Sequence, residues 1–224
     1  LELQPDRIAF YSYAHVPWTS RGQRLFDVND LPSAEEKMQL YMLGKRMFTD
    51  HGYIDIGMDH FALPSDDLYK AREEEYLHRN FMGYTTQKTA MLLGLGVSSI
   101  SDAGIAFAQN HKTIQQYYES VNNQELPVTK GYFLTGEDLA FRQYILDISC
   151  KGYTSFNRDD LAILKKYSFT ELKKLEEDEL LTWNENELTV TERGRFFIRN
   201  ICGAFDLHLL RNELAEKPQY SKAI

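Results

Sequence analysis

The stretch GYIDIGMDHFALP, residues 52–64, decides how the first half of this chain is read. Its YIDIGM part alternates apolar residues with polar or small ones, which is the pattern of a β-strand. The preceding residues 31–52 have the pattern of a helix, with Ser33 and Glu36 in capping-box spacing and Gly52 as a C-terminal stop. A helix that leads directly into a strand indicates an α/β arrangement.

The same alternation of strand and helix extends to both sides of this stretch. The predicted strands are QPDRIAFYSY (4–13), YIDIGM (53–58) and MLLGLGVSSI (91–100), and the predicted helices are residues 31–52, 65–77 and 111–123. This β-α-β-α-β-α order predicts parallel strands joined by helical crossovers, a fold in which ligands bind at the carboxyl ends of the strands. Those ends carry the sequences YAHVP, GMDHFALP and SSISDAG.

A second region begins near ELPVTKGYFLTGED, residues 125–138, which has the composition of a junction. We therefore predict one domain over residues 1–130 and another over residues 131–224. The second domain is predicted to be mostly helical and winged-helix-like, because its helices are followed by a hairpin. Its predicted elements are helices at EDLAFRQYILDISC (137–150), NRDDLAILKKY (157–167) and FTELKKLEEDELL (169–181), a hairpin at TWNENELTVT (182–191), and a final helix at RGRFFIRNICGAFDLHLLRN (193–212).

Composition narrows the classes of partner. The 224 residues are 43% hydrophobic and 26% charged, which is typical of a globular chain. A formal net charge of -8 argues against nucleic acid as a partner. The longest apolar runs are too short for a membrane helix, and the opening LELQPDR does not resemble an export signal. Because Cys150 and Cys202 are also far apart and in no metal-ligand spacing, we predict a cytoplasmic protein without a membrane partner.

Two stretches combine charged, aromatic and glycine residues in a way that predicts a ligand site. GMDHFALP (57–64) and HRNFMGYTT (78–86) look too irregular for helix or strand, so we expect them to be binding loops. In the second stretch His78 and Arg79 lie beside aromatic residues, Phe81 among them, and such a combination suits a carboxylate attached to a flat ring. The structural alternative is a loop that Arg79 holds in place.

Two further groups have both a functional and a structural interpretation. Asp59 next to His60 suits a proton relay or a metal pair, but neighbours on a strand usually point to opposite faces, so structural hydrogen bonding explains them equally well. Arg193, Arg195 and Arg199 have near-helical spacing and suit acidic groups of a ligand or of a neighbouring domain. A solvated helix face is the commoner explanation for such a stripe.

Taken together, these motifs resemble a known family. YSYAHVP, GYIDIGMDHFALP, LHRNFMGYTT, LLGLGVSSIS and TVTERGRFFIRNICGAFD, which span nearly the whole chain, are similar to the oxygen-independent coproporphyrinogen III oxidases of the radical S-adenosylmethionine (SAM) enzymes. The resemblance implies α/β architecture, with the C-terminal part of a radical-SAM partial (β/α) barrel followed by the helical, winged-helix-like domain. It also implies oxidative decarboxylation of two propionates of coproporphyrinogen III to vinyl groups, which gives protoporphyrinogen IX in haem biosynthesis.

The resemblance also implies two cofactors, S-adenosylmethionine and a four-iron four-sulfur (4Fe-4S) cluster held by a CxxxCxxC motif. This sequence lacks the motif, so we expect the cluster ligands to lie in preceding residues outside this chain, and the chain alone to be inactive. Each decarboxylation would pass one electron to an acceptor of unknown identity. The alternative function is that of a relative that binds haem or porphyrin without catalysis.

Four positions of this chain match functional positions of the family. The resemblance assigns S-adenosylmethionine contacts to Ala14 and Ile100, and it places Phe81 near the reaction chamber. Met82 stands where the family pattern has glutamine. Methionine lacks the amide donors and the acceptor of glutamine, which predicts a changed placement of cofactor or substrate around this loop.

Overall fold

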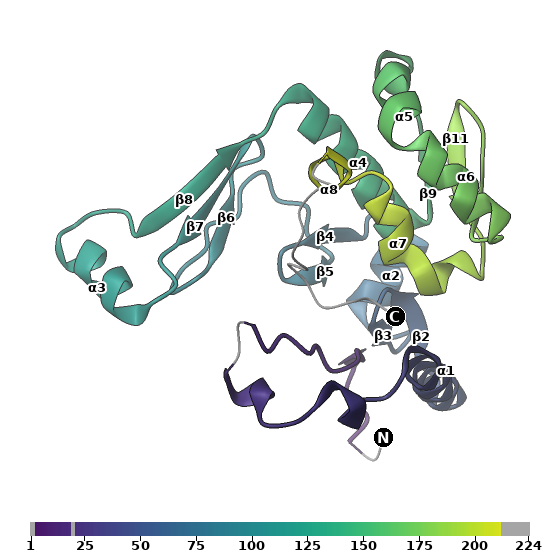
Figure 1. Cartoon of the computed structure of the whole chain (residues 1–224), viewed down its shortest axis with the longest axis horizontal. Helices are drawn as coiled ribbons and strands as arrows, with labels where there is room; N and C mark the ends of the chain where they lie inside the picture. Colours follow the sequence, from purple (N-terminus) through teal and green to yellow (C-terminus); the bar gives the residue numbers. More distant parts are fainter. Residues whose placement is uncertain (1–2, 19–20, 212–224) are drawn as a thin grey trace.

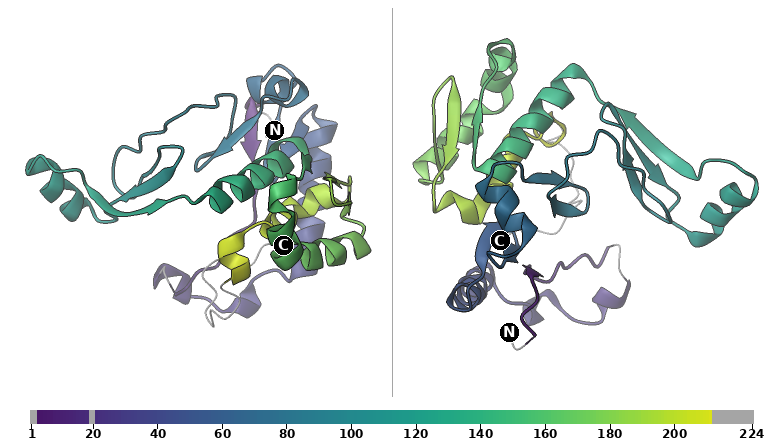
Figure 2. Two further views of the ribbon diagram at one scale, coloured as in Figure 1. Left: turned by 90° about the horizontal axis from the view of Figure 1, so that it is seen from above. Right: turned by 180° about the vertical axis from the view of Figure 1, so that it is seen from behind.

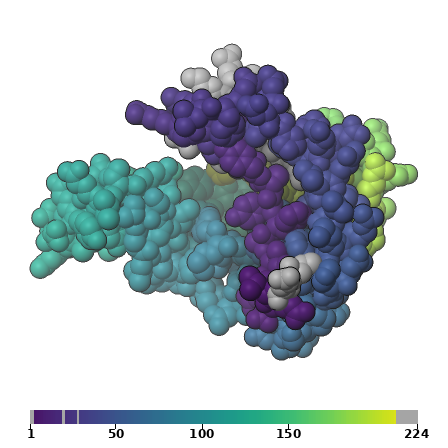
Figure 3. All heavy atoms as spheres, turned by 90° about the horizontal axis from the view of Figure 1, so that it is seen from below, coloured from purple at the N-terminus to yellow at the C-terminus, as the bar shows by residue number. Residues whose placement is uncertain are grey.

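The computed structural model describes residues 3–18 and 21–211, and three parts follow one another along the chain (Figure 1). The N-terminal part holds two small sheets and two α-helices, the middle part is an elongated arm, and the C-terminal part is mostly helical. The arm stands out from the other two parts in the ribbon views and in the space-filling view (Figures 2 and 3). Helices and strands occur in all three parts, as the predicted α/β class requires.

The first sheet consists of three antiparallel strands in the order β1–β3–β2. The strands are β1 (Arg7–Ala9), β2 (Ile54–Gly57) and β3 (His60–Ala62). The prediction of parallel strands with helical crossovers is wrong, since every strand pair in the described part of the chain is antiparallel. β2 turns into β3 at Met58, which has a φ of 48°. The turn lacks the Asn-Gly or Asp-Gly pair that signals a hairpin in sequence, so the sequence pattern did not reveal it.

A second hairpin follows, formed by β4 (His78–Asn80) and β5 (Gly83–Thr85). The expectation that GMDHFALP and HRNFMGYTT are irregular loops is therefore wrong, because each contributes to a short hairpin. The tip of this second hairpin carries Phe81 and Met82, and Gly83 follows with a φ of 122° that a larger residue rarely adopts. Short strands with tight turns look irregular in sequence because three residues are too few to show an alternating pattern.

The two helices of this part agree with the sequence pattern. α1 (Ala34–Asp50) begins at a confirmed capping box, in which the Ser33 hydroxyl accepts from the Glu36 N–H at 3.2 Å and the Glu36 carboxylate accepts from the Ser33 N–H at 2.8 Å. α2 (Asp67–Glu73) is shorter than predicted. Strands, helix and hairpin share one small core, made of Ile56, Ala62, Leu68, Ala71, Leu77 and Tyr84.

The arm is a three-stranded antiparallel sheet with one helix at its far end (Figure 1). Its elements are β6 (Ile100–Asp102), β7 (Ala106–Asn110), α3 (Ile114–Asn122) and β8 (Val128–Phe133). The predicted buried strand at residues 91–100 is wrong, because residues 91–99 form no strand and have one isolated bridge, from Leu92 to Asp102, before a turn at residues 97–98. The expected boundary between residues 130 and 131 falls inside β8, which pairs with β7.

The C-terminal part packs helices around a third three-stranded sheet, in the order β10–β11–β9. Its elements are α4 (Gly136–Lys151), β9 (Tyr153–Ser155), α5 (Leu161–Tyr167), α6 (Phe169–Glu177), β10 (Leu181–Trp183), β11 (Glu187–Val190), α7 (Ile198–Gly203) and α8 (Leu207–Arg211). Short 3₁₀ turns cover Arg21–Arg24, Val28–Asp30, Arg158–Asp160 and Gly194–Phe197. The final helix predicted over residues 193–212 is therefore broken into three pieces, and its last residue lies outside the described residues.

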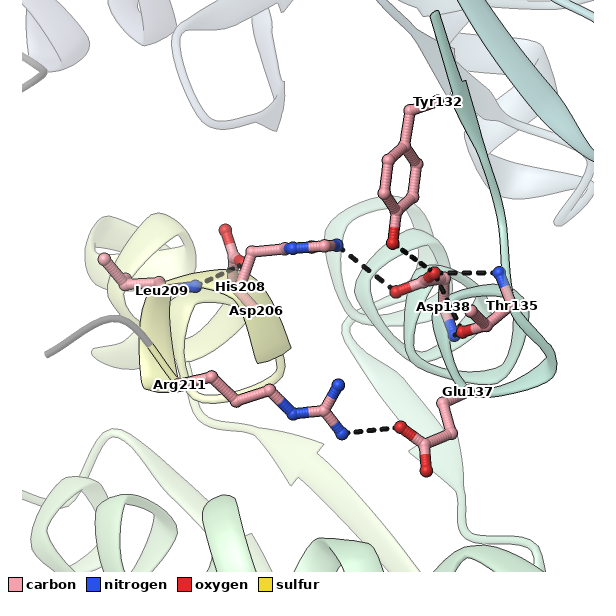
Figure 4. A network of polar contacts seen from close by, with 8 residues as sticks. All are labelled: Tyr132, Thr135, Glu137, Asp138, Asp206, His208, Leu209 and Arg211. Atoms are coloured by element: carbon pink, nitrogen blue, oxygen red, sulfur yellow. Dashed lines mark hydrogen bonds and ion pairs between the residues drawn. The ribbon is translucent and has the colours of Figure 1, made fainter.

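A network of polar contacts joins the arm to the end of the C-terminal part (Figure 4). Asp138, in the first turn of α4, accepts a hydrogen bond from the Tyr132 hydroxyl of β8 at 2.8 Å. Its other oxygen lies 3.3 Å from Nε2 of His208 in α8. Arg211 of α8 pairs with Glu137 at 2.5 Å. These contacts fix α8 against the start of α4.

None of the helices in the described ranges is long and apolar enough to cross a membrane.

Candidate functional site

A cavity of about 380 Å³ opens where the N-terminal segment, both hairpin turns, α1 and α7 meet. Its aromatic side chains include Tyr11 and Tyr13 of the N-terminal segment, Tyr41 of α1, Phe81 of the second hairpin turn and Phe196 of the 3₁₀ turn that precedes α7. The charged residues among those that line it are Asp59, Arg79 and Arg199. An aromatic cavity with a few charged groups is the usual form of a small-molecule site.

Arg79 lies in the wall of this cavity with spare hydrogen-bonding capacity. Its guanidinium stacks over the Tyr84 ring, 4.9 Å from the ring centroid. Nη1 is buried and has no hydrogen-bond partner among the described residues. A buried charged donor without a partner is costly, and an anionic ligand would satisfy it. Arg79 is therefore the residue of this cavity best suited to bind a carboxylate.

His60 supports the same wall. Its ring meets the Tyr84 ring edge-to-face at 5.3 Å, and its Nδ1 is buried with no hydrogen-bond partner in the described ranges. Burial, and then the positive charge of Arg79, lower the pKa of His60. The imidazole is therefore neutral at neutral pH and can donate or accept one hydrogen bond towards the cavity. No cluster of three or more His, Cys, Asp or Glu side chains in the described residues could hold a metal ion, so the proposed metal pair with Asp59 has no third ligand.

Asp59 and Arg199 form an ion pair across the cavity wall. Asp59 lies in the turn between β2 and β3, and Arg199 comes from α7, far away in sequence. Beside them Tyr41 donates its hydroxyl hydrogen bond to the Met58 carbonyl oxygen at 3.0 Å. Burial, and then the Asp55 and Asp59 carboxylates, raise the pKa of Tyr41, so its hydroxyl remains protonated. The C-terminal part thus supplies one side of the cavity.

The residues predicted from sequence divide between this cavity and other places. Ala14, Arg79, Phe81 and Met82 line it together. His78 does not, because neighbours on a strand point to opposite faces, and it faces a small cavity of about 50 Å³ beside Arg142 and Asp102. Burial, and then Lys88 and Arg142, lower the pKa of His78.

Ile100, the other predicted cofactor contact, belongs to the arm. It pairs with Gln109 at the start of β6 and is not among the described residues that line the 380 Å³ cavity. A neighbouring cavity of about 330 Å³ shares Arg79 and Phe81 with the first and extends towards the arm. Phe81 lines both cavities and meets Phe107 of the arm edge-to-face at 5.1 Å.

Sequence reasoning gave Arg199 two interpretations and did not single out Tyr41 or Asn200, which also line the cavity. The signal for Arg199 was its place in the basic stripe of Arg193, Arg195 and Arg199. The structure separates this stripe, since Arg193 pairs with Glu179 at 3.2 Å, while Arg199 reaches the cavity. No sequence signal marks Tyr41, which looks like one more apolar position of α1.

The two cysteines do not fit the ligation of an iron–sulfur cluster. Cys150 and Cys202 are free thiols, one half-buried and one buried. Burial raises the pKa of both, that of Cys202 to about 12, so both stay protonated at neutral pH. Cluster ligation requires several thiolates at one place, which the described residues do not offer.

Comparison with known proteins gives a consistent result. No family model matches the chain. The chain is 39% identical over its whole length to oxygen-independent coproporphyrinogen III oxidase of Synechocystis and 40% identical to that of Escherichia coli. It spans about half the length of these curated relatives, 50% in each case. The enzyme of Thermostichus vulcanus is 37% identical over 93% of this chain and 66% of its own length.

A solved structure agrees with these relatives. Coproporphyrinogen III oxidase from Escherichia coli, described as a radical SAM enzyme, superposes with a TM-score of 0.85 and 39% identity over 93% of this chain and 49% of its own. The family predicted from the sequence motifs is thereby confirmed. This chain is homologous to the C-terminal part of the oxygen-independent coproporphyrinogen III oxidases and belongs with that family.

Proposed function

We propose that this chain is the substrate-facing half of an oxygen-independent coproporphyrinogen III oxidase. The whole protein would decarboxylate two propionates of coproporphyrinogen III oxidatively to vinyl groups and give protoporphyrinogen IX. The observation that carries this proposal is Arg79, a guanidinium with a buried, unpartnered Nη1 in an aromatic cavity. A flat ring with carboxylates at its edge is the kind of ligand that satisfies both features.

Within this cavity the chain would bind, orient and shield the substrate. Arg79 would hold a propionate, and the exposed ring of Phe81 would lie against the macrocycle or the cofactor. Neutral His60 would accept or donate a hydrogen bond at the same wall. His78 faces the small cavity beside Arg142, so a propionate that reaches His78 would lie on the other side of β4.

S-adenosylmethionine and the 4Fe-4S cluster would supply the radical that starts the reaction, and the cluster ligands would lie outside this chain. Ala14 borders the main cavity, which supports its assignment as a contact of S-adenosylmethionine. Ile100 lies on the arm, so its assignment requires the cofactor to reach beyond this cavity. The aromatic and apolar wall around Ala14 suits a nucleoside by shape. The electron acceptor would be a further partner.

We also propose that residues 153–190 form a winged-helix-like unit, on the basis of their element order β9–α5–α6–β10–β11. Their surface carries no excess of basic residues, so a role in packing against the rest of the protein fits better than one in nucleic-acid binding. A cytoplasmic location is consistent with two free, protonated thiols.

The proposed function is tested with the full-length protein, reconstituted with its cluster and supplied anaerobically with coproporphyrinogen III and S-adenosylmethionine. We expect protoporphyrinogen IX from the full-length protein and none from residues 1–224 alone. Arg79→Ala should lower kcat/KM by at least about tenfold, as the loss of a hydrogen bond to a charged group predicts, and Arg79→Lys should recover part of it. Arg193→Ala is the matched control, since Arg193 pairs with Glu179 away from the cavity.

Two outcomes would contradict the proposal. Porphyrin binding without turnover by the reconstituted full-length protein would favour the non-catalytic porphyrin-binding alternative. Unchanged kinetics in Arg79→Ala would remove Arg79 from the site and with it the observation on which the assignment of this cavity depends.

A further inference from the structure

We propose that Arg199 is a second carboxylate-binding residue of the main cavity, paired with Asp59 while the cavity is empty and shared with a carboxylate of the ligand when it is filled. The identity of the ligand, a flat polycarboxylate, rests on the proposed function. The binding role of Arg199 rests on the charges of the cavity itself. In the sequence this residue belongs to a basic stripe with two interpretations, a ligand or domain contact and a solvated face, and the comparisons assign no role to it.

The first step of the argument is the charge of the cavity wall. Among the described residues that line it, Arg79 and Arg199 are cationic and Asp59 is anionic, and the pKa of His60 is lowered by burial. Two guanidinium groups and one carboxylate leave an excess of one positive charge. The cavity therefore favours an anion even though the chain as a whole has a net charge of -8.

The second step is the strength of the Asp59–Arg199 pair. The Asp59 side chain is 19% exposed, whereas that of Arg199 is 51% exposed. An ion pair with one partner half in water is screened and weakly held. A guanidinium carries five N–H donors, so it can keep Asp59 and accept a second carboxylate at another edge. The exposed side of Arg199 is thus free to take part in binding.

The third step is the placement of the two arginines. Arg79 comes from β4 of the N-terminal part, and Arg199 comes from α7 of the C-terminal part. Both lie close enough to His60 to lower its pKa by their charge. A ligand with carboxylates at two points of its edge would bind both arginines at once and so connect the two parts of the chain. A ligand with one carboxylate would engage only one of them.

The decisive measurement is equilibrium binding of coproporphyrin III, the oxidised four-carboxylate ring, to full-length protein, followed by its fluorescence. Its tetramethyl ester serves as the uncharged probe. Arg199→Ala should weaken coproporphyrin binding about tenfold, with little effect on the ester. Arg199→Lys should lose less of the coproporphyrin affinity than Arg199→Ala does. Asp59→Asn, which removes the competing carboxylate, should bind coproporphyrin as tightly as the unaltered protein or more tightly.

The control and the contrary outcomes are distinct. Arg193→Ala removes another exposed arginine of the same region and should leave coproporphyrin binding unchanged. Equal losses of coproporphyrin affinity in Arg199→Ala and Asp59→Asn would show that the ion pair only stabilises the structure. Unchanged coproporphyrin affinity in Arg199→Ala would also contradict the inference. If the variants bind coproporphyrin as expected but the unaltered full-length protein forms no product, the proposed enzymatic function is rejected and the carboxylate site is retained. Absent binding of coproporphyrin to the unaltered protein would reject both.

Discussion

The hydroxyl of Tyr84 donates a hydrogen bond to the backbone carbonyl oxygen of Ser149 at 2.7 Å, and both residues are buried. Tyr84 belongs to β5, beside the candidate site, and Ser149 lies in the last turn of α4. The final carbonyl groups of a helix have no partner within the helix, so Tyr84 supplies one of these missing donors. One side chain thereby connects the hairpin that carries Arg79 to the C-terminal part.

Tyr84→Phe should therefore destabilise the protein by about 1–3 kcal/mol, the cost of leaving a buried carbonyl without its donor. The change is measured as the free energy of unfolding in urea. Tyr118→Phe, on the exposed face of α3 in the arm, is the control and should have almost no effect. Equal stability of the two variants would mean that water replaces the Tyr84 hydroxyl.

Gly194 has a steric role that a single added methyl group reveals. A Cβ at this position would lie 1.8 Å from the backbone carbonyl oxygen of Leu180, closer than real atoms approach. Gly194→Ala should therefore destabilise the protein by about 3 kcal/mol or more, because backbone must move. Gly203, at the end of α7, has open space around its Cβ position, so Gly203→Ala should be neutral or slightly stabilising.

Thermal unfolding of these two variants provides the measurement. A clear drop in Tm for Gly194→Ala, with little change or a rise for Gly203→Ala, is the expected result. If both variants unfold at the temperature of the unaltered protein, the contact between residues 194 and 180 is looser than the structure places it.

The sequence predicted helices α1 and α4 and the family, but not the pairing of the strands. The capping boxes at Ser33 and Thr135 are local signals, and both helices begin there. Strand pairing depends on contacts between distant residues, and the turn at Met58 carries no hairpin signal. The apolar run at residues 91–99 predicted a buried strand, but Leu93 and Leu95 are exposed. An apolar run has the same sequence pattern whether its side chains are buried or exposed.

The candidate site was predictable where several of the residues that line it belong to one motif. HRNF gave Arg79 and Phe81, which both line the cavity. The other arginine, Arg199, lies 140 residues from its partner Asp59, and no periodicity within one sequence connects such positions. His78 shows the opposite case, because its adjacency to Arg79 in sequence places it on the other face of β4, where it lines a different cavity.

Met82 can be replaced to test its contribution to ligand binding with little effect on stability. Its side chain is 81% exposed at the tip of the β4–β5 hairpin and lines the main cavity. Met82→Gln should leave Tm unchanged within about 1 °C, since exposed substitutions rarely alter stability. In the full-length protein the restored amide should lower the KM for coproporphyrinogen III or for S-adenosylmethionine. Unchanged values of both would show that this position does not contribute to binding.

Stability at low pH should depend on Asp138. Burial alone would raise the pKa of this carboxyl, but hydrogen bonds from Thr135 and Tyr132 outweigh burial and hold the pKa below its usual value (Figure 4). The unfolded chain then binds a proton at a higher pH than the folded chain does. The stabilisation is complete above the unfolded pKa of about 4 and is lost as the pH falls through the folded value.

Asp138→Asn should remove this contribution, so the variant should be less stable than the unaltered protein at pH 7, and the difference should shrink below about pH 4. The free energy of unfolding, measured at pH 7, 5 and 3, tests the slope. Glu137→Gln is the matched control, because Glu137 is half-buried and its ion pair in the described residues is with Arg211 of α8. If Asp138→Asn lowers the free energy of unfolding equally at all three pH values, the hydrogen bonds of Asp138 stabilise the protein and its charge does not.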